Sequence, residues 1–222
     1  MTEVNGVIFD ASGTLIDDLF PVWQTNLKIF AHMGIPSMTL NDFKERFTLP
    51  YWKFYRSLGI QENKAKNEAN TLFKRFYAEL SSNVKLFPEV KSTIDDLKRI
   101  SMKLAIVSSM PKDYLILHLK KFNIYTYFDV IISSEDCDES KPSPKPILIC
   151  VSRLGLNHSH VVYVGDMEED IIAGKKADVK TVAVSREGSY HQRKKLEKRN
   201  PDFMIDDLRE LLRVIKQIDL QR

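Results

Sequence analysis

Short apolar runs that end in a polar residue recur along this chain and alternate with stretches of helical periodicity. The first run, Val7 to Phe9, ends at Asp10 and is followed by small residues and Gly13. Further runs span 103–107, 130–132, 160–164, 179–184 and 203–205. Strands that alternate with helices predict an α/β fold with a doubly wound, parallel, Rossmann-like sheet.

Residues 16–82 interrupt this alternation, because their apolar positions have helical spacing and no convincing strand is present. Aromatic residues dominate the apolar stripes, which are broken near Gly34 and at Pro50. The pattern indicates an all-helical insert directly after the first strand. We therefore expect an α/β core domain made of residues 1–15 and 83–222, and a helical domain made of residues 16–82.

The composition limits the classes of function that need consideration. The 33 basic and 30 acidic residues leave a net charge of only +3, which argues against a nucleic-acid binder or a membrane-surface protein. Two cysteines form neither a disulfide framework nor a zinc site. We expect neither a leader nor a membrane-spanning segment, and hence a cytoplasmic protein. The sequence leaves open whether it is a monomer or a homodimer.

Polar residues stand where several predicted strands end, notably Asp10, Ser108 and Asp166. Lys141 lies in a later loop, and Asp170 precedes a helix expected from about residue 171. Since parallel strands end at one edge of a sheet, these side chains are expected to converge. Carboxylates in one cleft repel unless a cation joins them, and oxygen ligands suit Mg²⁺. A hydroxyl and a lysine beside that cation suit a phosphate, and Asp10 becomes a candidate nucleophile.

Each of these residues also has a purely structural interpretation. Ser108, taken alone, is better explained as a helix N-cap. Lys141 has the alternative interpretation of an exposed loop lysine. Asp170 can support the first turn of its helix through the helix dipole. Asp166 is harder to explain in this way, because it follows an entirely apolar run. The occurrence of all these residues in this order favours a functional site over a chance arrangement.

The motifs together resemble those of the haloacid dehalogenase superfamily, nearest to its phosphoglycolate-phosphatase-like members with a helical cap. The family motif D-x-D-G-T is similar to residues 10–14, which read D-A-S-G-T. The second motif, a Ser or Thr after an apolar strand, matches Ser108. The lysine motif, often K-P-x-P, matches residues 141–144, and G-D-x-x-x-D matches residues 165–170. The insert at 16–82 corresponds to the family's cap.

The resemblance implies a Mg²⁺-dependent phosphatase that acts on a small phosphorylated metabolite through a covalent aspartyl phosphate on Asp10. The implied metal ligands are Asp10, the backbone carbonyl of Ser12, Asp166 and, directly or through water, Asp170. The implied phosphate-binding residues are Ser108, Ser109 and Lys141. The loop around Pro50 is expected to face the nucleophile, and its candidates for substrate selection are Thr48, Tyr51, Trp52 and Lys53.

Ser12 departs from the family motif, which has a second Asp at this position as general acid and base. Loss of such a group typically costs about 10²–10⁴ in rate. Because of this resemblance, Ser12 predicts a slow or selective phosphatase. Such an enzyme would favour leaving groups that need little protonation, such as acyl or aryl groups.

Two other functions stay open because of Ser12. One is a non-catalytic or regulatory phosphate-binding protein on this fold. The other is a C–P or C–halogen hydrolase, similar to phosphonoacetaldehyde hydrolases or dehalogenases. Dehalogenases generally lack the acids that match Asp166 and Asp170, and C–P cleavage would need a Schiff-base lysine in the cap. The lysines available for that role are Lys28, Lys44 and Lys53.

Overall fold

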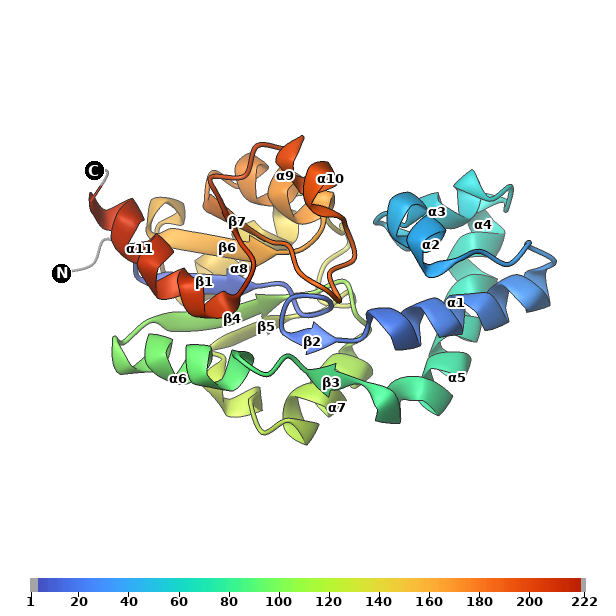
Figure 1. Ribbon diagram of the computed structural model, residues 1–222, viewed down its shortest axis with the longest axis horizontal. Helices are drawn as coiled ribbons and strands as arrows, with labels where there is room; N and C mark the ends of the chain where they lie inside the picture. Colours follow the sequence, from blue (N-terminus) through green and yellow to red (C-terminus); the bar gives the residue numbers. More distant parts are fainter. Residues whose placement is uncertain (1–3, 221–222) are drawn as a thin grey trace.

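The computed structural model describes residues 4–220, and a six-stranded parallel sheet lies at its centre (Figure 1). The strand order is β5-β4-β1-β6-β7-β8, and every neighbouring pair is parallel. The strands are β1 (Gly6–Phe9), β4 (Lys103–Val107), β5 (Val130–Ile132), β6 (Val161–Gly165), β7 (Lys180–Val184) and β8 (Phe203–Ile205). Each lies within about one residue of its expected position, so the doubly wound α/β prediction is confirmed.

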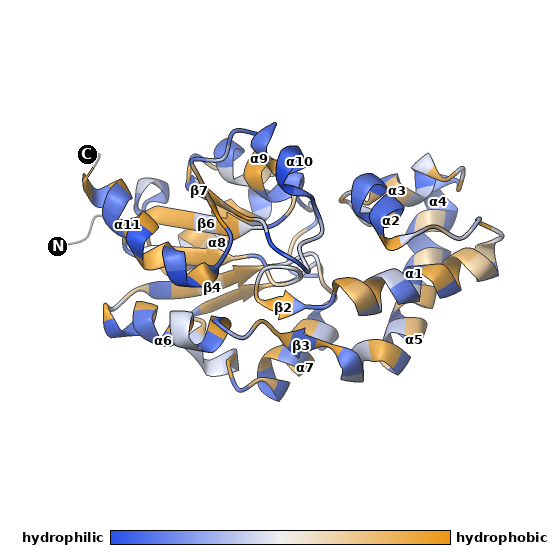
Figure 2. Cartoon of the chain, in the orientation of Figure 1, coloured by the Kyte–Doolittle hydropathy of each residue, from blue (hydrophilic) through white to orange (hydrophobic). Residues whose placement is uncertain are grey.

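Helices cover both faces of the sheet, which explains why its central strands are continuous apolar runs. Val7 and Phe9 of β1 pack into one hydrophobic cluster, and Ile8 packs into another on the opposite face. The flanking helices are α6 (Val90–Arg99), α7 (Lys112–Lys121), α8 (Lys145–Leu154), α9 (Glu168–Lys176), α10 (Arg193–Glu197) and α11 (Leu211–Leu220). Figure 2 shows the hydrophobic strands enclosed by helices with hydrophilic outer faces.

A separate group of helices, the helical segment, lies beyond one end of the sheet (Figure 1). It consists of α1 (Leu19–Met33), α2 (Leu40–Arg46), α3 (Tyr51–Ser57), α4 (Glu62–Lys64) and α5 (Asn70–Leu80), with a π-helical turn at Ala65–Ala69. Phe30, Phe43 and Phe54 are buried in its centre and pack at ring distances of 5.5–6.0 Å. Aromatic pairs of this kind contribute about 0.5–1.5 kcal/mol beyond the area that they bury.

Two short strands connect this helical segment to the sheet. β2 (Ile16–Asp17) pairs antiparallel with β3 (Lys85–Leu86). The expectation that residues 16–82 contain no strand was therefore wrong for Ile16 and Asp17. Two residues are too few to show a period, and their partner lies far along the chain. No helix within residues 4–220 is long and apolar enough to cross a lipid bilayer.

Candidate active site

The carboxyl ends of β1 and β6 bring three aspartates together. Asp10 follows β1, Asp166 follows β6, and Asp170 lies in the first turn of α9. One oxygen from each carboxylate lies within 4.8 Å of the others, and all three side chains are buried. The convergence expected from the parallel topology is therefore present.

Helix α9 begins at Glu168, three residues before the expected start, and Asp170 explains the difference. Its Oδ2 accepts a hydrogen bond from the backbone N–H of Met167 at 2.9 Å, which caps the helix. A Cβ atom on Gly165 would lie 2.4 Å from Cγ of Asp170. Only glycine at residue 165 therefore lets the Asp170 carboxylate turn back toward the end of β6.

Lys141 joins two of the three carboxylates. Its Nζ lies 2.5 Å from Oδ1 of Asp10, 2.6 Å from Oδ1 of Asp170 and 3.1 Å from the hydroxyl of Tyr163. The Lys141 side chain is only 2% exposed, so the interpretation as a solvated loop lysine is wrong. Burial removes the ammonium group of a lysine from water, and this cost exceeds the free energy gained from an ion pair at the surface. A lysine buried this deeply therefore needs charged partners close to it.

The electrostatics of the cluster favour an additional cation. Burial raises the pKa of Asp10 to about 7, with Lys141 opposing and Asp170 reinforcing the increase. Burial, then Asp10 and Asp170, raise the pKa of Asp166 well above its usual range. Burial opposes the charge of Lys141, but the two aspartates outweigh it and raise its pKa. Lys141 thus pairs with only two of the three carboxylates, and the oxygen donors of the cluster fit a hard divalent ion such as Mg²⁺.

Asp166 is held in place by the loop that follows β1 and by a later loop. The hydroxyl of Thr14 donates to Oδ1 of Asp166 at 3.2 Å, and the backbone N–H of Tyr190 donates to Oδ2 at 2.5 Å. Gly13 has φ +75°, and a Cβ atom there would lie 2.2 Å from Oδ2 of Asp166. The glycine of the D-A-S-G-T motif is therefore required both by backbone conformation and by space.

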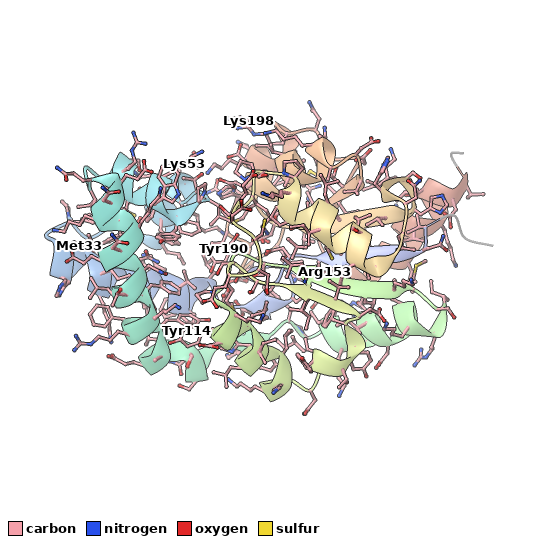
Figure 3. All side chains as sticks on the ribbon, turned by 180° about the vertical axis from the view of Figure 1, so that it is seen from behind. Met33, Lys53, Tyr114, Arg153, Tyr190 and Lys198 are labelled. Atoms are coloured by element: carbon pink, nitrogen blue, oxygen red, sulfur yellow. The ribbon has the colours of Figure 1, made fainter. Side chains whose placement is uncertain are left out.

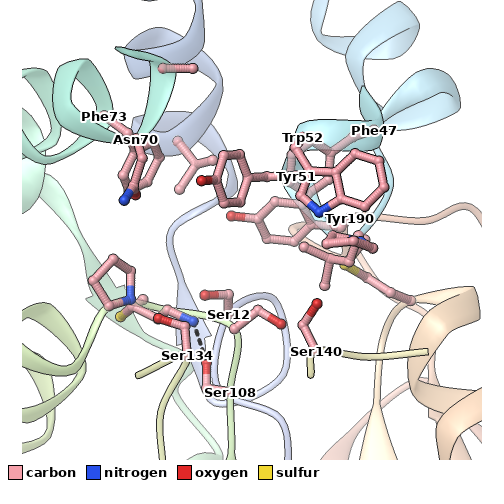
Figure 4. Close-up of a pocket in the computed structure, with 18 of the residues that line it drawn as sticks. Ser12, Phe47, Tyr51, Trp52, Asn70, Phe73, Ser108, Ser134, Ser140 and Tyr190 are labelled. Carbon is pink, nitrogen blue, oxygen red and sulfur yellow. Dashed lines mark hydrogen bonds between the residues drawn. The ribbon is translucent and has the colours of Figure 1, made fainter. Parts of the chain in front are cut away.

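The serines expected to bind phosphate lie on one side of a cavity of about 280 Å³, together with Asp10 and Ser12. Ser108 accepts a hydrogen bond from the backbone N–H of Met110, but Pro111, not Ser108, precedes α7. The N-cap interpretation of Ser108 was therefore wrong. Figure 4 shows Ser12, Ser108, Ser134 and Ser140 on this side, which is called the serine floor below.

The opposite side of the cavity is formed by the helical segment, and Tyr51 and Trp52 line it as expected. The other two expected residues do not. The Thr48 hydroxyl donates instead to Oε1 of Glu169, and Lys53 is exposed, with Nζ 5.7 Å from the centre of the Trp52 ring. Figure 3 shows Tyr190 at the junction between the helical segment and the sheet, with Lys53 on the helical segment.

Asp18 was missed by the sequence analysis, although it is completely buried and lines the same cavity as Ser12. Its Oδ1 accepts a hydrogen bond from the Tyr190 hydroxyl at 3.1 Å. Burial raises the pKa of Asp18 to about 7, against hydrogen bonds from Ser12 and Tyr190. The only signal in the sequence was the Asp17-Asp18 pair, and nothing in that pattern shows which of the two is buried.

Tyr163 was also missed. It lies on the face of β6 opposite to Val162 and Val164, and its hydroxyl is 3.0 Å from Oδ1 of Asp170. A tyrosine within an otherwise apolar buried strand was the available signal, because a buried hydroxyl needs a hydrogen-bond partner.

Residues 7–184 match the family model of haloacid dehalogenase-like hydrolases. The chain belongs to this family. Relatives that cover nearly the whole chain carry two different names. A pyrophosphatase PpaX from Bacillus velezensis is 29% identical, over 96% of each protein. A phosphoglycolate phosphatase from Photorhabdus laumondii is 30% identical, over 96% of this chain and 92% of that one.

Solved structures agree on the fold of the family. A putative phosphoglycolate phosphatase from Lactobacillus plantarum superposes with a TM-score of 0.85 at 18% identity, covering 96% of this chain and all of that one. A putative haloacid dehalogenase-like hydrolase from Bacteroides fragilis gives a TM-score of 0.81 at 22% identity, covering 93% and 99%. At these identities the likeness establishes the architecture of the chain, and the chemistry must be argued from its own residues.

Proposed function

We propose that this hydrolase is a Mg²⁺-dependent phosphatase that acts on a small phosphorylated metabolite through an aspartyl phosphate on Asp10. The observation that carries the proposal is the convergence of Asp10, Asp166, Asp170 and Lys141 at one edge of the sheet. The relatives named pyrophosphatase and phosphoglycolate phosphatase support the same reaction type.

The residues divide the chemistry among themselves. Mg²⁺ held by Asp10, Asp166, Asp170 and the Ser12 carbonyl would neutralise charge on the phosphoryl oxygens. The Asp10 carboxylate attacks phosphorus, so that an O–P bond forms while the bond to the leaving group breaks with its electron pair. Water then cleaves the acyl phosphate, which releases phosphate and restores the carboxylate.

Lys141, Ser108 and Ser109 have supporting roles in this mechanism. Lys141 holds Oδ1 of Asp10 and keeps Asp10 and Asp170 from repelling each other. Ser108 and Ser109 lie in the cavity beside Asp10, where their hydroxyls and backbone N–H groups would bind the phosphoryl oxygens. The helical segment would act as the cap, which excludes water from the acyl phosphate and selects the substrate.

The decisive experiment is Asp10→Asn, assayed with p-nitrophenyl phosphate and acetyl phosphate in Mg²⁺. An amide cannot form the acyl phosphate, so kcat should fall by at least about 10³-fold. EDTA should abolish the activity of the unmodified protein. Asp17→Asn is the matched control, because Asp17 is near in sequence and does not line the cavity. Full activity in Asp10→Asn would refute the proposal.

A second candidate function, a phosphate-binding protein without turnover, is favoured by Ser12 alone. It predicts binding of phosphate with Mg²⁺ and no hydrolysis across a broad panel of phosphomonoesters, so any appreciable hydrolysis excludes it. C–P cleavage through a Schiff base has less support, since Lys28, Lys44 and Lys53 are not among the residues that line the cavity. Borohydride trapping that labels none of these lysines would exclude it.

A further inference from the structure

We propose that the substrate is an aryl phosphate, a phosphomonoester whose leaving group is a phenol that carries no further charged group. This inference rests on the proposed phosphatase function and adds the substrate class to it. The observation behind it is the two-sided character of the cavity: the serine floor lies next to Asp10, and an aromatic roof lies opposite. The roof is defined by Tyr51, Trp52 and Phe73.

The roof places ring surface where the leaving group must lie. Tyr51, Trp52 and Phe73 all come from the helical segment and are only partly buried. Figure 4 shows the three rings across the cavity from Ser12 and Ser108. A phosphoryl group on the serine floor therefore directs the rest of the substrate toward these rings, where a flat apolar group can stack.

The three rings are held in place by contacts with neighbouring residues of the helical segment. The Tyr51 hydroxyl donates to the backbone carbonyl of Lys66 at 3.0 Å. Phe73 stacks on Tyr77, with ring centres 5.2 Å apart and an interplanar angle of 14°. Lys66 lies with Nζ 4.8 Å from the centre of the Trp52 ring. Rings fixed in this way lose little entropy when a ligand stacks on them.

The charges of the cavity oppose a second anionic group on the substrate. Within residues 4–220, no Lys, Arg or His side chain lines the cavity, whereas Asp10, Asp18 and Asp138 do. A carboxylate or a second phosphate inside the cavity would be desolvated without a cation among the lining side chains. The cations nearest to the roof, Lys53, Arg56 and Lys66, lie against the Trp52 ring and do not line the cavity. The cavity thus fits an uncharged leaving group better than the glycolate or phosphate that the relatives' names specify.

The size of the cavity and the chemistry of Ser12 favour the same class of substrate, an aryl phosphate. A cavity of about 150 Å³ accommodates one benzene molecule. The cavity of about 280 Å³ therefore holds one ring together with a phosphoryl group. Aryl oxygens also leave with less protonation than alkyl oxygens, so a serine at residue 12 costs an aryl phosphate less than an alkyl phosphate.

The test measures binding of phosphonates, which cannot be hydrolysed, by calorimetry in the presence of Mg²⁺. Benzylphosphonate carries the ring, ethylphosphonate carries neither ring nor second charge, and phosphonoacetate carries a second anion. Benzylphosphonate should bind about tenfold more tightly than ethylphosphonate, as expected for one buried stacking contact. Phosphonoacetate should bind no more tightly than ethylphosphonate.

Two pairs of variants test whether the roof causes the preference for benzylphosphonate. Trp52→Ala should remove most of the benzyl preference, whereas Trp23→Ala should keep it, because Trp23 does not line the cavity. Phe73→Leu keeps an apolar side chain but loses the ring, and Phe76→Leu, three residues further along α5, is its control. The Leu pair keeps the test valid if either alanine variant fails to fold.

The outcomes separate this inference from the proposed function. Failure of all three phosphonates to bind would overturn the phosphate site itself. Binding of all three with equal affinity, or tightest binding of phosphonoacetate, would overturn the aromatic substrate class and leave the phosphatase proposal intact. A benzyl preference that survives both Trp52→Ala and Phe73→Leu would also overturn it.

Discussion

Lys141 and Lys145 lie four residues apart and carry the same charge, but their surroundings differ completely. Lys141 is buried between Asp10 and Asp170, whereas the Lys145 side chain is 43% exposed and pairs with Asp138 and Glu139. Lys141→Met should lower the free energy of unfolding by about 3–5 kcal/mol, because it leaves buried carboxylates without their partner. Lys145→Met should have little or no effect.

Urea denaturation in EDTA measures both lysine variants without help from divalent ions. Similar losses for Lys141→Met and Lys145→Met would contradict the expected difference between the buried and the solvent-accessible ion pairs.

His118 predicts a pH dependence of stability that arises outside the aspartate cluster. It is buried beside Tyr77, whose hydroxyl lies 3.0 Å from Nε2, and its Nδ1 has no hydrogen-bond partner among the described residues. Burial, reinforced by Lys121, lowers its pKa from 6.5 to about 4. The unfolded chain therefore binds a proton at this residue before the folded chain does.

The His118 contribution is fully present above about pH 6.5 and is lost as the pH falls toward 4. His118→Gln keeps a polar group next to Tyr77 but does not titrate. The variant should therefore lose less stability than the unmodified protein between pH 6.5 and pH 4, as measured by chemical denaturation at a series of pH values. Parallel curves for the two proteins would show that His118 has no such role.

At the scale of elements, helix α9 is connected to the loop that precedes α3. Oε1 of Glu169 accepts a hydrogen bond from the backbone N–H of Leu49 at 3.0 Å and another from the hydroxyl of Thr48. His191 reaches the same loop, with Nε2 3.0 Å from the carbonyl of Phe47. Since Glu169 stands next to Asp170, this contact couples the roof of the cavity to the aspartate cluster.

Glu169→Ala should loosen this connection. A hydrogen bond to a charged group contributes about 1.5–3 kcal/mol, so exchange of the Leu49 amide hydrogen should become about tenfold faster or more. Glu197→Ala is the control, because Glu197 pairs with Arg193 and not with this loop. Equal exchange rates at Leu49 in Glu169→Ala and in the unmodified protein would refute the coupling.

For the whole molecule, the aspartate cluster predicts that Mg²⁺ stabilises the folded chain. A ligand at about 100 times its Kd adds about 2.7 kcal/mol to the free energy of unfolding. For a chain of this length each kcal/mol raises Tm by about 2–4 °C, so a rise of about 5–11 °C is expected. Differential scanning calorimetry with and without Mg²⁺ measures it.

Asp166→Asn should abolish most of this rise in Tm, because it removes one carboxylate from the cluster. Asp178→Asn is the control, since Asp178 is exposed and outside the cluster. An undiminished Mg²⁺ effect in Asp166→Asn would place the ion elsewhere.

Much of the architecture was predictable before any coordinates. The alternation of apolar runs with helical stretches located each strand of the main sheet to within about one residue. That alternation also implied that Asp10, Asp166 and Asp170 share an edge, because parallel strands all end on the same side. β2 and β3 were not predictable, since two paired residues leave no period in the sequence.

The residues around the cavity depended on the tertiary structure. Asp17 and Asp18 are indistinguishable in sequence, and only packing against Tyr190 buries the second. Thr48 and Lys53 were expected in the cavity, but contacts with Glu169 and Trp52 hold them outside it.

Local patterns therefore determined which segments are strands and helices, because the spacing of apolar residues that lie close together in the sequence differs between the two. Which side chains face the cavity was decided by contacts between segments far apart along the chain, and no local pattern records those contacts.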